Sequence, residues 1–194
     1  QLRTIANLHP SGDAPAGRSL AITLPTIRMN KDRHIKSKRK RTWTDLRVEI
    51  KKLCEQLNLS KDEFSEVNIK EWKEIESKIW TRFTSIKNSR WIWETLVDDY
   101  SAIPVNYKTL DLESLFDSSE KVWFLLGESV NGQTKFWNYD GTIKAFNKIF
   151  WESSRTDEIL IVSKKYEWIL IINHHDIMIG TGKMKDQIEK LKSR

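Results

Sequence analysis

The residues best placed to do chemistry form a short polar group, Asn173-His174-His175-Asp176, that follows an apolar run. An imidazole can act as a general acid or base near neutral pH, and it is a common metal ligand. Neighbouring residues at the end of a strand point to opposite faces, so we expect the two imidazoles not to serve one metal ion. The other two histidines lie within residues 1–41, and the nearby sequence has no Ser or Cys elbow that could supply a nucleophile.

We therefore predict no metal, no cofactor and no catalytic residues, and three interpretations of this group stay open. In the first, Asn173 and Asp176 shape a turn by bonding their own backbone, and the histidines are half-buried turn residues. In the second, His174 and His175 belong to a loop that recognises a partner. In the third, a small hydrolase uses one imidazole together with Asp176. We favour a non-enzymatic protein.

The positive charge of the chain is confined to its N-terminal part. The whole sequence carries a net charge of +6, residues 1–41 carry +8, and the remainder carries −2. The basic run ends in Lys36, Lys38, Arg39, Lys40 and Arg41. Such runs are typical of disordered arms, and they can also bind nucleic acid through phosphate contacts. Residues 31–41 contain no aromatic side chain, so they offer no base stacking.

Length and composition restrict the class of protein. The chain has 194 residues, enough for one domain with appendages, and it has no apolar run of membrane-spanning length. A single cysteine, Cys54, cannot form an internal disulfide. We expect a cytoplasmic protein without membrane contact, with a disordered basic arm over residues 1–41 and a single α+β domain over residues 42–194.

The first part of the expected domain, residues 42–118, has the three-to-four spacing of helices. Apolar residues follow this spacing from Leu46 to Leu57 and again from Ile69 to Ile86. Ser60 with Glu63 forms a capping box that predicts the start of a short helix. A further helix is expected after Ser89, ending by Pro104.

The second part, residues 119–194, changes to the pattern of strands. Asn131-Gly132, between two apolar runs, is a strong signal for a hairpin turn. The runs 159–162 and 168–172 are apolar at every position, which is typical of strands covered on both faces. We predict N-terminal helices followed by a mainly antiparallel β-β-α-β-β-β-α unit.

Several short segments of this second part resemble known sequences. Lys121-Val-Trp-Phe-Leu, Lys135-Phe-Trp-Asn-Tyr and Tyr166-Glu-Trp-Ile, together with the Asn173 to Asp176 group, are similar to an uncharacterised family of small bacterial proteins. The hairpin, helix and following strands also resemble immunity-type domains of the SMI1/KNR4 kind. That resemblance implies a cytoplasmic bacterial protein that binds and neutralises a toxin.

The leading hypothesis is a non-enzymatic protein-binding domain whose partner is a toxin or another bacterial protein. Large aromatic residues beyond the needs of a core often become interface anchors, and the chain has nine tryptophans. We expect the contact surface at Asn173, His174, His175 and Asp176, and at the hairpin residue Asn131. The alternative functions are nucleic-acid binding through the basic run and hydrolysis at the His-His-Asp loop.

Overall fold

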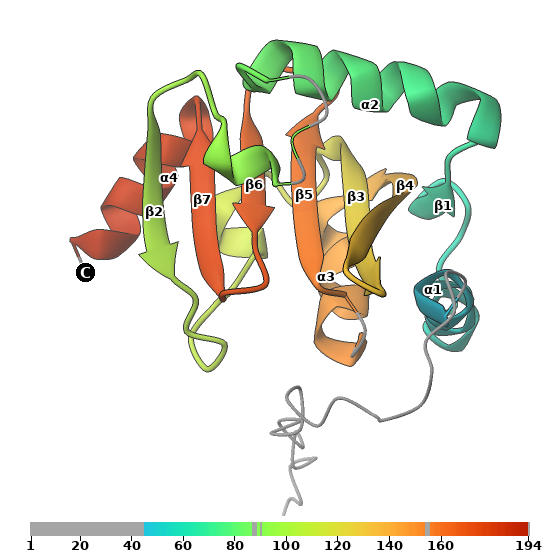
Figure 1. Cartoon of the computed structure of the whole chain (residues 1–194). Coiled ribbons are helices and arrows are strands. Elements are labelled where there is room, and N and C mark those ends of the chain that lie inside the picture. The colour runs from blue at the N-terminus through green and yellow to red at the C-terminus, as the bar shows by residue number, and fades with distance from the viewer. Residues whose placement is uncertain (1–44, 87–88, 90, 154–155, 194) are drawn as a thin grey trace, which may run out of the picture. The chain divides into compact units, whose positions relative to one another are not determined.

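The computed structural model describes residues 45–86, 89, 91–153 and 156–193. Within them the fold is α+β, as the sequence predicts, with four α-helices and one seven-stranded antiparallel sheet (Figure 1). None of these helices has the length and apolar character needed to cross a membrane. The elements are α1 (Asp45–Gln56), β1 (Phe64–Glu66), α2 (Ile69–Phe83), η1 (Ile92–Glu94), β2 (Tyr100–Pro104), η2 (Glu113–Leu115), β3 (Lys121–Val130), β4 (Gln133–Thr142), α3 (Ile143–Glu152), β5 (Glu158–Ser163), β6 (Ile169–Ile172), β7 (Ile177–Thr181) and α4 (Lys183–Lys192).

The sheet has the strand order β1-β4-β3-β5-β6-β7-β2, so β5 lies at its centre. Every residue of β5 and β6 is buried, which confirms the expectation that these apolar strands are covered on both faces. The two strands pair antiparallel from Ile159 opposite Ile172 to Val162 opposite Ile169. The turn that joins β6 to β7 projects from this buried centre.

Helices cover both faces of the sheet. On one face, which we call the α2 face, Glu76 of α2 accepts a hydrogen bond from Asn138 of β4. On the opposite face the ring of Phe146 in α3 stacks on Phe124 of β3, and α4 packs closely against Gly180 of β7. Figure 1 shows α3 and α4 behind the sheet, with α2 passing across the upper ends of its strands.

Helix α2 forms because its apolar residues fall on one stripe. Trp72, Ile75, Ile79 and Phe83 are buried at spacings of three and four, while lysine and glutamate residues occupy the other sides. The side chain of Asn68 caps the helix by accepting a hydrogen bond from the Lys70 backbone N–H. Each buried side chain of this size contributes about 1.5–3 kcal/mol by leaving water, so the stripe fixes the helix on the sheet.

Residues 42–118 are less helical than the sequence predicts, because two strands arise within them. The segment after Ser89 forms only the short 3₁₀ helix η1 and then strand β2, where a longer helix was expected. Strand β2 pairs with β7, from Tyr100 opposite Thr181 to Pro104 opposite Ile177. Pairing with a strand so distant in sequence overrides the local helical pattern, and Pro104 is tolerated because β2 is an edge strand.

The capping box at Ser60 also leads into a strand. Its reciprocal hydrogen bonds form as predicted: Glu63 N–H donates to Ser60 Oγ, and Ser60 N–H donates to the Glu63 carboxylate. The expected helix is absent, because Phe64 leaves the turn as the first residue of β1 and stacks on Tyr139 at 5.0 Å. The capping box fixes one turn, and burial of Phe64 in the core then directs the chain into a strand.

The hairpin between β3 and β4 has the predicted two-residue turn. Asn131 and Gly132 both have positive φ, at 52° and 77°, and Val130 pairs with Gln133. Asparagine and glycine are favoured in such a turn because both tolerate the left-handed region. Ten residue pairs of β3 and β4 follow this turn in unbroken register.

Candidate functional site

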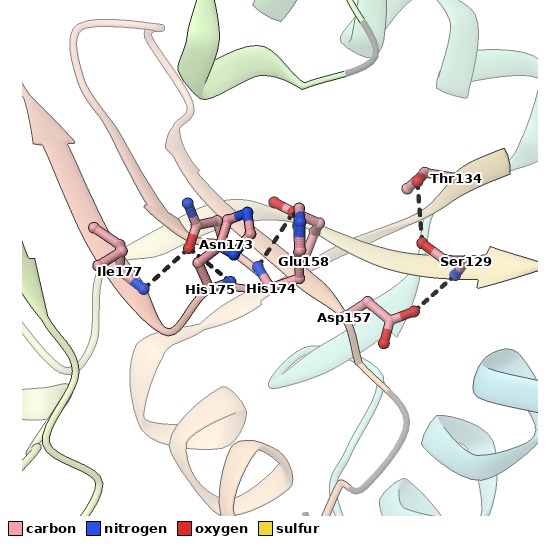
Figure 2. A network of polar contacts seen from close by, with 8 residues as sticks. All are labelled: Ser129, Thr134, Asp157, Glu158, Asn173, His174, His175 and Ile177. Carbon is pink, nitrogen blue, oxygen red and sulfur yellow. Dashed lines mark hydrogen bonds and ion pairs between the residues drawn. The ribbon is translucent and has the colours of Figure 1, made fainter. Parts of the chain in front are cut away.

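His174 and His175 lie in the turn that joins β6 to β7 (Figure 2). The side chain of Asn173, which is 3% exposed, holds this turn from inside. Its Oδ1 accepts hydrogen bonds from the backbone N–H groups of His175, at 3.1 Å, and Ile177, at 3.0 Å. The predicted role of Asn173 as a residue that bonds its own backbone is therefore visible in the structure.

Asp176 completes the turn in a different way from Asn173. Its backbone has φ of 58°, and its N–H donates to the Asn173 carbonyl. Its carboxylate accepts a 2.6 Å hydrogen bond from the Tyr107 hydroxyl, and its carbonyl accepts one from Val105 N–H. Asp176 thus anchors the turn to the segment after β2, and it is Tyr107, not an imidazole, that its carboxylate binds.

The two imidazoles lie side by side, with ring centroids 4.0 Å apart and ring planes 41° from parallel. The expectation that they point to opposite faces is wrong, because it treats both residues as the end of a strand. Strand β6 ends at Ile172, and His174 and His175 belong to the turn, where side chains need not alternate.

His174 is paired with a buried carboxylate that the sequence analysis did not single out. Its Nδ1 lies 2.5 Å from Oε1 of Glu158, and its backbone N–H donates to the same oxygen at 3.3 Å. Glu158 is 1% exposed, whereas the His174 side chain is 34% exposed. With Nδ1 directed to the carboxylate, Nε2 remains as the second polar atom of a partly exposed ring.

Burial raises the pKa of the Glu158 carboxyl, because the charged form loses its water. Hydrogen bonds from the side chain and backbone of His174 act in the opposite direction. The buried indole N–H of Trp93 lies near the same carboxylate and also lowers this pKa. Glu158 is therefore a carboxylate tuned by several neighbours at once, a feature that recurs at functional sites.

Two tryptophans from the η1 segment complete the group. The Trp91 ring lies 4.6 Å from the His174 ring, and the Trp93 ring lies 5.9 Å from the His175 ring with its edge against it. The two indoles are themselves 6.5 Å apart and nearly parallel, at 24°. We call Trp91, Trp93, His174 and His175 the aromatic patch.

Register explains why Glu158 fits beneath the aromatic patch. Glu158 pairs with Gly127 of β3, and it lies one residue beyond the pair formed by Ile159 and Ile172. A Cβ on Gly127 would lie 2.7 Å from Glu158 Cβ and 3.1 Å from Phe136 Cε1, so only glycine leaves room there. The sequence signal was the one acidic residue at the start of a strand otherwise apolar up to Ser163.

Asn131, the other predicted contact residue of the folded part, does not belong to the aromatic patch. Asn131 lies at the tip of the β3–β4 hairpin, beyond the Gly127–Glu158 pair and so toward the same end of the sheet. Among the described residues, no group of three or more His, Cys, Asp or Glu side chains is arranged to hold a metal ion. Lys36, Lys38, Arg39, Lys40 and Arg41 lie outside the described residues.

A second polar network adjoins Glu158. Asp157 accepts a 3.0 Å hydrogen bond from the backbone N–H of Ser129, and the Ser129 hydroxyl lies 3.1 Å from the Thr134 hydroxyl (Figure 2). These contacts tie the start of β5 to the β3–β4 hairpin. Chemically, the whole arrangement offers a partly exposed imidazole with an acidic partner, beside flat aromatic faces.

Comparison with known proteins gives a family without an assigned activity. No curated protein and no solved structure matches the chain. The model of one family, described as a family of unknown function (DUF6756), matches residues 42–192. The match begins where the basic run ends and covers every helix and strand of the described fold. The chain therefore belongs to the DUF6756 family.

Proposed function

We propose that this α+β domain is a non-enzymatic protein-binding module that recognises its partner with the aromatic patch. The observation that carries the proposal is the contact of the two partly exposed histidine rings with the rings of Trp91 and Trp93, next to buried Glu158. Tryptophan is enriched among residues that dominate binding energy, because one side chain supplies a large apolar face and an N–H donor.

The turn that carries the histidines is ordered by its own hydrogen bonds in the absence of a partner. The Asn173 side chain accepts hydrogen bonds from the backbone N–H groups of His175 and Ile177, and the Asp176 carboxylate accepts one from the Tyr107 hydroxyl. A preordered surface loses little conformational entropy on association, which favours affinity. Contact through the Asn131 hairpin, at the same end of the sheet, is part of this proposal.

The class of partner comes from the resemblance to immunity-type domains. It supports a bacterial toxin as the partner and the cytoplasm as the place where the complex forms. A toxin gene beside the gene of this protein, and protection of cells that express both, would support this choice. A toxin whose action is undiminished by co-expression would count against it.

The test of the surface uses the full chain as bait. A partner captured from cell lysate is identified by mass spectrometry, purified and titrated by calorimetry against the wild type, the His174→Ala/His175→Ala double variant and Trp91→Ala. We expect each variant to bind about tenfold or more weakly, as for interface hot spots. Lys78→Ala, an exposed change on α2, is the matched control. Unchanged affinity of the double variant would refute the role of the aromatic patch.

A second candidate function is acid–base catalysis, and one observation favours it. The Glu158–His174 pair has the geometry in which a carboxylate orients an imidazole and fixes its tautomer. This differs from the hydrolase expected from sequence, because Glu158 replaces Asp176 as the partner of the imidazole. Turnover of model esters or phosphodiesters by the wild type, lost in both His174→Ala and Glu158→Gln, would favour this candidate over binding.

A further inference from the structure

The outer edge of β4 is only partly covered. All ten residues of β4 pair with β3 on one side. On the other side β1 covers only the three residues from Tyr139 to Gly141. In the part of the chain that the structure describes, residues 133–138 of β4 have no strand beside them on that edge.

The register shows which backbone groups face this open edge. Val130 and Gln133 close the two-residue turn, so Gln133 and every second residue after it bond to β3. The residues between them, including Thr134, Phe136 and Asn138, direct N–H and C=O outward. Asn138 follows this rule, because its carbonyl accepts a 2.9 Å hydrogen bond from Val67 N–H just outside β1. Thr134 and Phe136 therefore present the next main-chain donors and acceptors along the edge.

A groove of about 710 Å³ lies between this part of β4 and α2. Its β4 side consists of residues 134–136, and its α2 side extends from Ile69 to Thr81. Trp72, Trp80 and Phe136 supply its aromatic wall, with the Trp80 ring edge-on to Phe136 at 5.7 Å. A helix flanking an exposed strand edge is the arrangement that binds an extended peptide as an added strand.

The charged residues of the groove indicate what kind of peptide it would bind. Lys73 and Lys135 line it, while burial raises the pKa of the Glu76 carboxyl, the acidic group of the lining. Side chains of an added strand alternate in direction. Those on the Phe136 side would meet the aromatic wall, and those between them would lie on the Lys135 side, where Lys135 Nζ lies 4.1 Å from the Trp137 ring.

We infer that this groove binds an extended acidic peptide of a partner protein, added to β4 as a further strand, with apolar and acidic residues in alternation. The occupant is a peptide and not a second copy of this chain, because antiparallel β4–β4 pairing would bring the Lys135 side chains of the two copies close together. Like charges opposite each other on paired strands are destabilising. The inference goes beyond the proposed function, since it names a second surface and the conformation of its ligand.

The test uses a fluorescent seven-residue peptide in which Glu alternates with Val or Phe, and its affinity is measured by polarisation. Thr134→Pro removes an outward N–H without touching the β3 ladder, and Thr134→Val keeps that N–H while losing the same hydroxyl contact to Ser129. We expect Thr134→Pro to bind about tenfold more weakly, the effect of one or two lost hydrogen bonds, and Thr134→Val to bind like the wild type.

Charge and specificity controls complete the test. Lys135→Glu should weaken binding, Lys78→Glu should not, and a peptide with Lys in place of Glu should bind poorly. Equal binding by Thr134→Pro and Thr134→Val would overturn strand addition. A concentration-dependent dimer that Thr134→Pro abolishes would show that the occupant of the groove is a second copy of the chain and not a partner's peptide. The His174→Ala/His175→Ala variant should bind the peptide normally. A negative result in this test therefore leaves the proposal for the aromatic patch standing, and the reverse also holds.

Discussion

At the scale of single residues, the aromatic patch depends on the buried carboxylate of Glu158 and on glycine, which has no side chain, at position 127. Glu158 meets His174 only because Gly127 leaves space beside it. A buried carboxyl group without partners is strongly destabilising, and here the imidazole and backbone N–H of His174 offset part of that cost. The exposed surface is therefore coupled to the packing of three central strands.

The first prediction concerns pH. Because burial raises the pKa of Glu158, its contribution to stability is fully present below the ordinary carboxyl pKa and is lost as pH rises through the folded-state pKa. The decline is at most about 1.4 kcal/mol per pH unit. Glu158→Gln should remove it, so urea unfolding from about pH 4 to about pH 8 should show the wild type losing stability relative to the variant. Glu74→Gln, an exposed change on α2, should leave the decline in place.

The second prediction concerns Gly127. Gly127→Ala should destabilise the fold by about 1–3 kcal/mol, because the new Cβ would overlap the Glu158 side chain. It should also displace the carboxylate from His174, which NMR of the imidazole resonances would detect. A variant with wild-type stability and unchanged imidazole resonances would show that the sheet can shift to accept the methyl group.

At the scale of elements, turns and central strands follow from local sequence, while edge strands do not. The Asn131-Gly132 hairpin and the apolar strands β5 and β6 were predictable, because each signal lies within a few neighbouring residues. Strand β2 was not, since its extended form depends on β7. The contact between the Trp91 and His174 rings was not predictable either, because no spacing rule links residues so distant in sequence.

The third prediction separates backbone strain from packing in the β3–β4 turn. Gly132 has φ of 77°, and a Cβ there would meet nothing within 4 Å. Gly132→Ala should therefore cost about 1–2 kcal/mol through backbone conformation alone. Asn131→Gly, where φ is also positive, should change stability by much less. Thermal unfolding of both variants provides the comparison, and an equal loss of stability in the two would contradict the left-handed backbone conformation of Gly132.

The fourth prediction concerns the turn between β6 and β7. Asn173→Ala leaves two backbone N–H groups without their acceptor and should destabilise the protein by about 1–3 kcal/mol. Amide hydrogen exchange at His175 and Ile177 should accelerate more than exchange in β5. Asn173→Asp keeps an acceptor oxygen and should protect these amides better than alanine does. Unchanged exchange in Asn173→Ala would show that other groups hold the turn.

At the scale of the whole molecule, the excess positive charge and the family match lie in different parts of the chain. Residues 1–41 carry a net charge of +8, and the family match begins at residue 42. The two candidate surfaces of the folded part, the aromatic patch and the groove beside β4, both involve the α2 face of the sheet. Recognition by the aromatic patch is thus expected to depend on shape and aromatic contact, whereas recognition in the groove also uses the local positive charge of Lys73 and Lys135.

The fifth prediction concerns the basic residues that precede the family match. Any affinity for DNA or RNA should reside in residues 1–41 and fall steeply with salt, because it arises from lysine and arginine contacts with phosphates. Deleting residues 1–41 should abolish that affinity while the melting temperature of the remainder stays close to that of the full chain. Retained, salt-sensitive binding after the deletion would contradict the assignment.

The pairing of β2 with β7 also has a consequence for the time course of biosynthesis. Tyr100 leaves the ribosome about 80 residues before its partner Thr181, a wait of roughly 4–16 s at typical rates of synthesis. During that interval Trp91 and Trp93 have no His174 or His175 ring to contact, and β2 lacks its partner strand β7. Chains stalled before residue 173 should therefore expose indole surface to chaperones, and the aromatic patch should be among the last regions of the newborn protein to form.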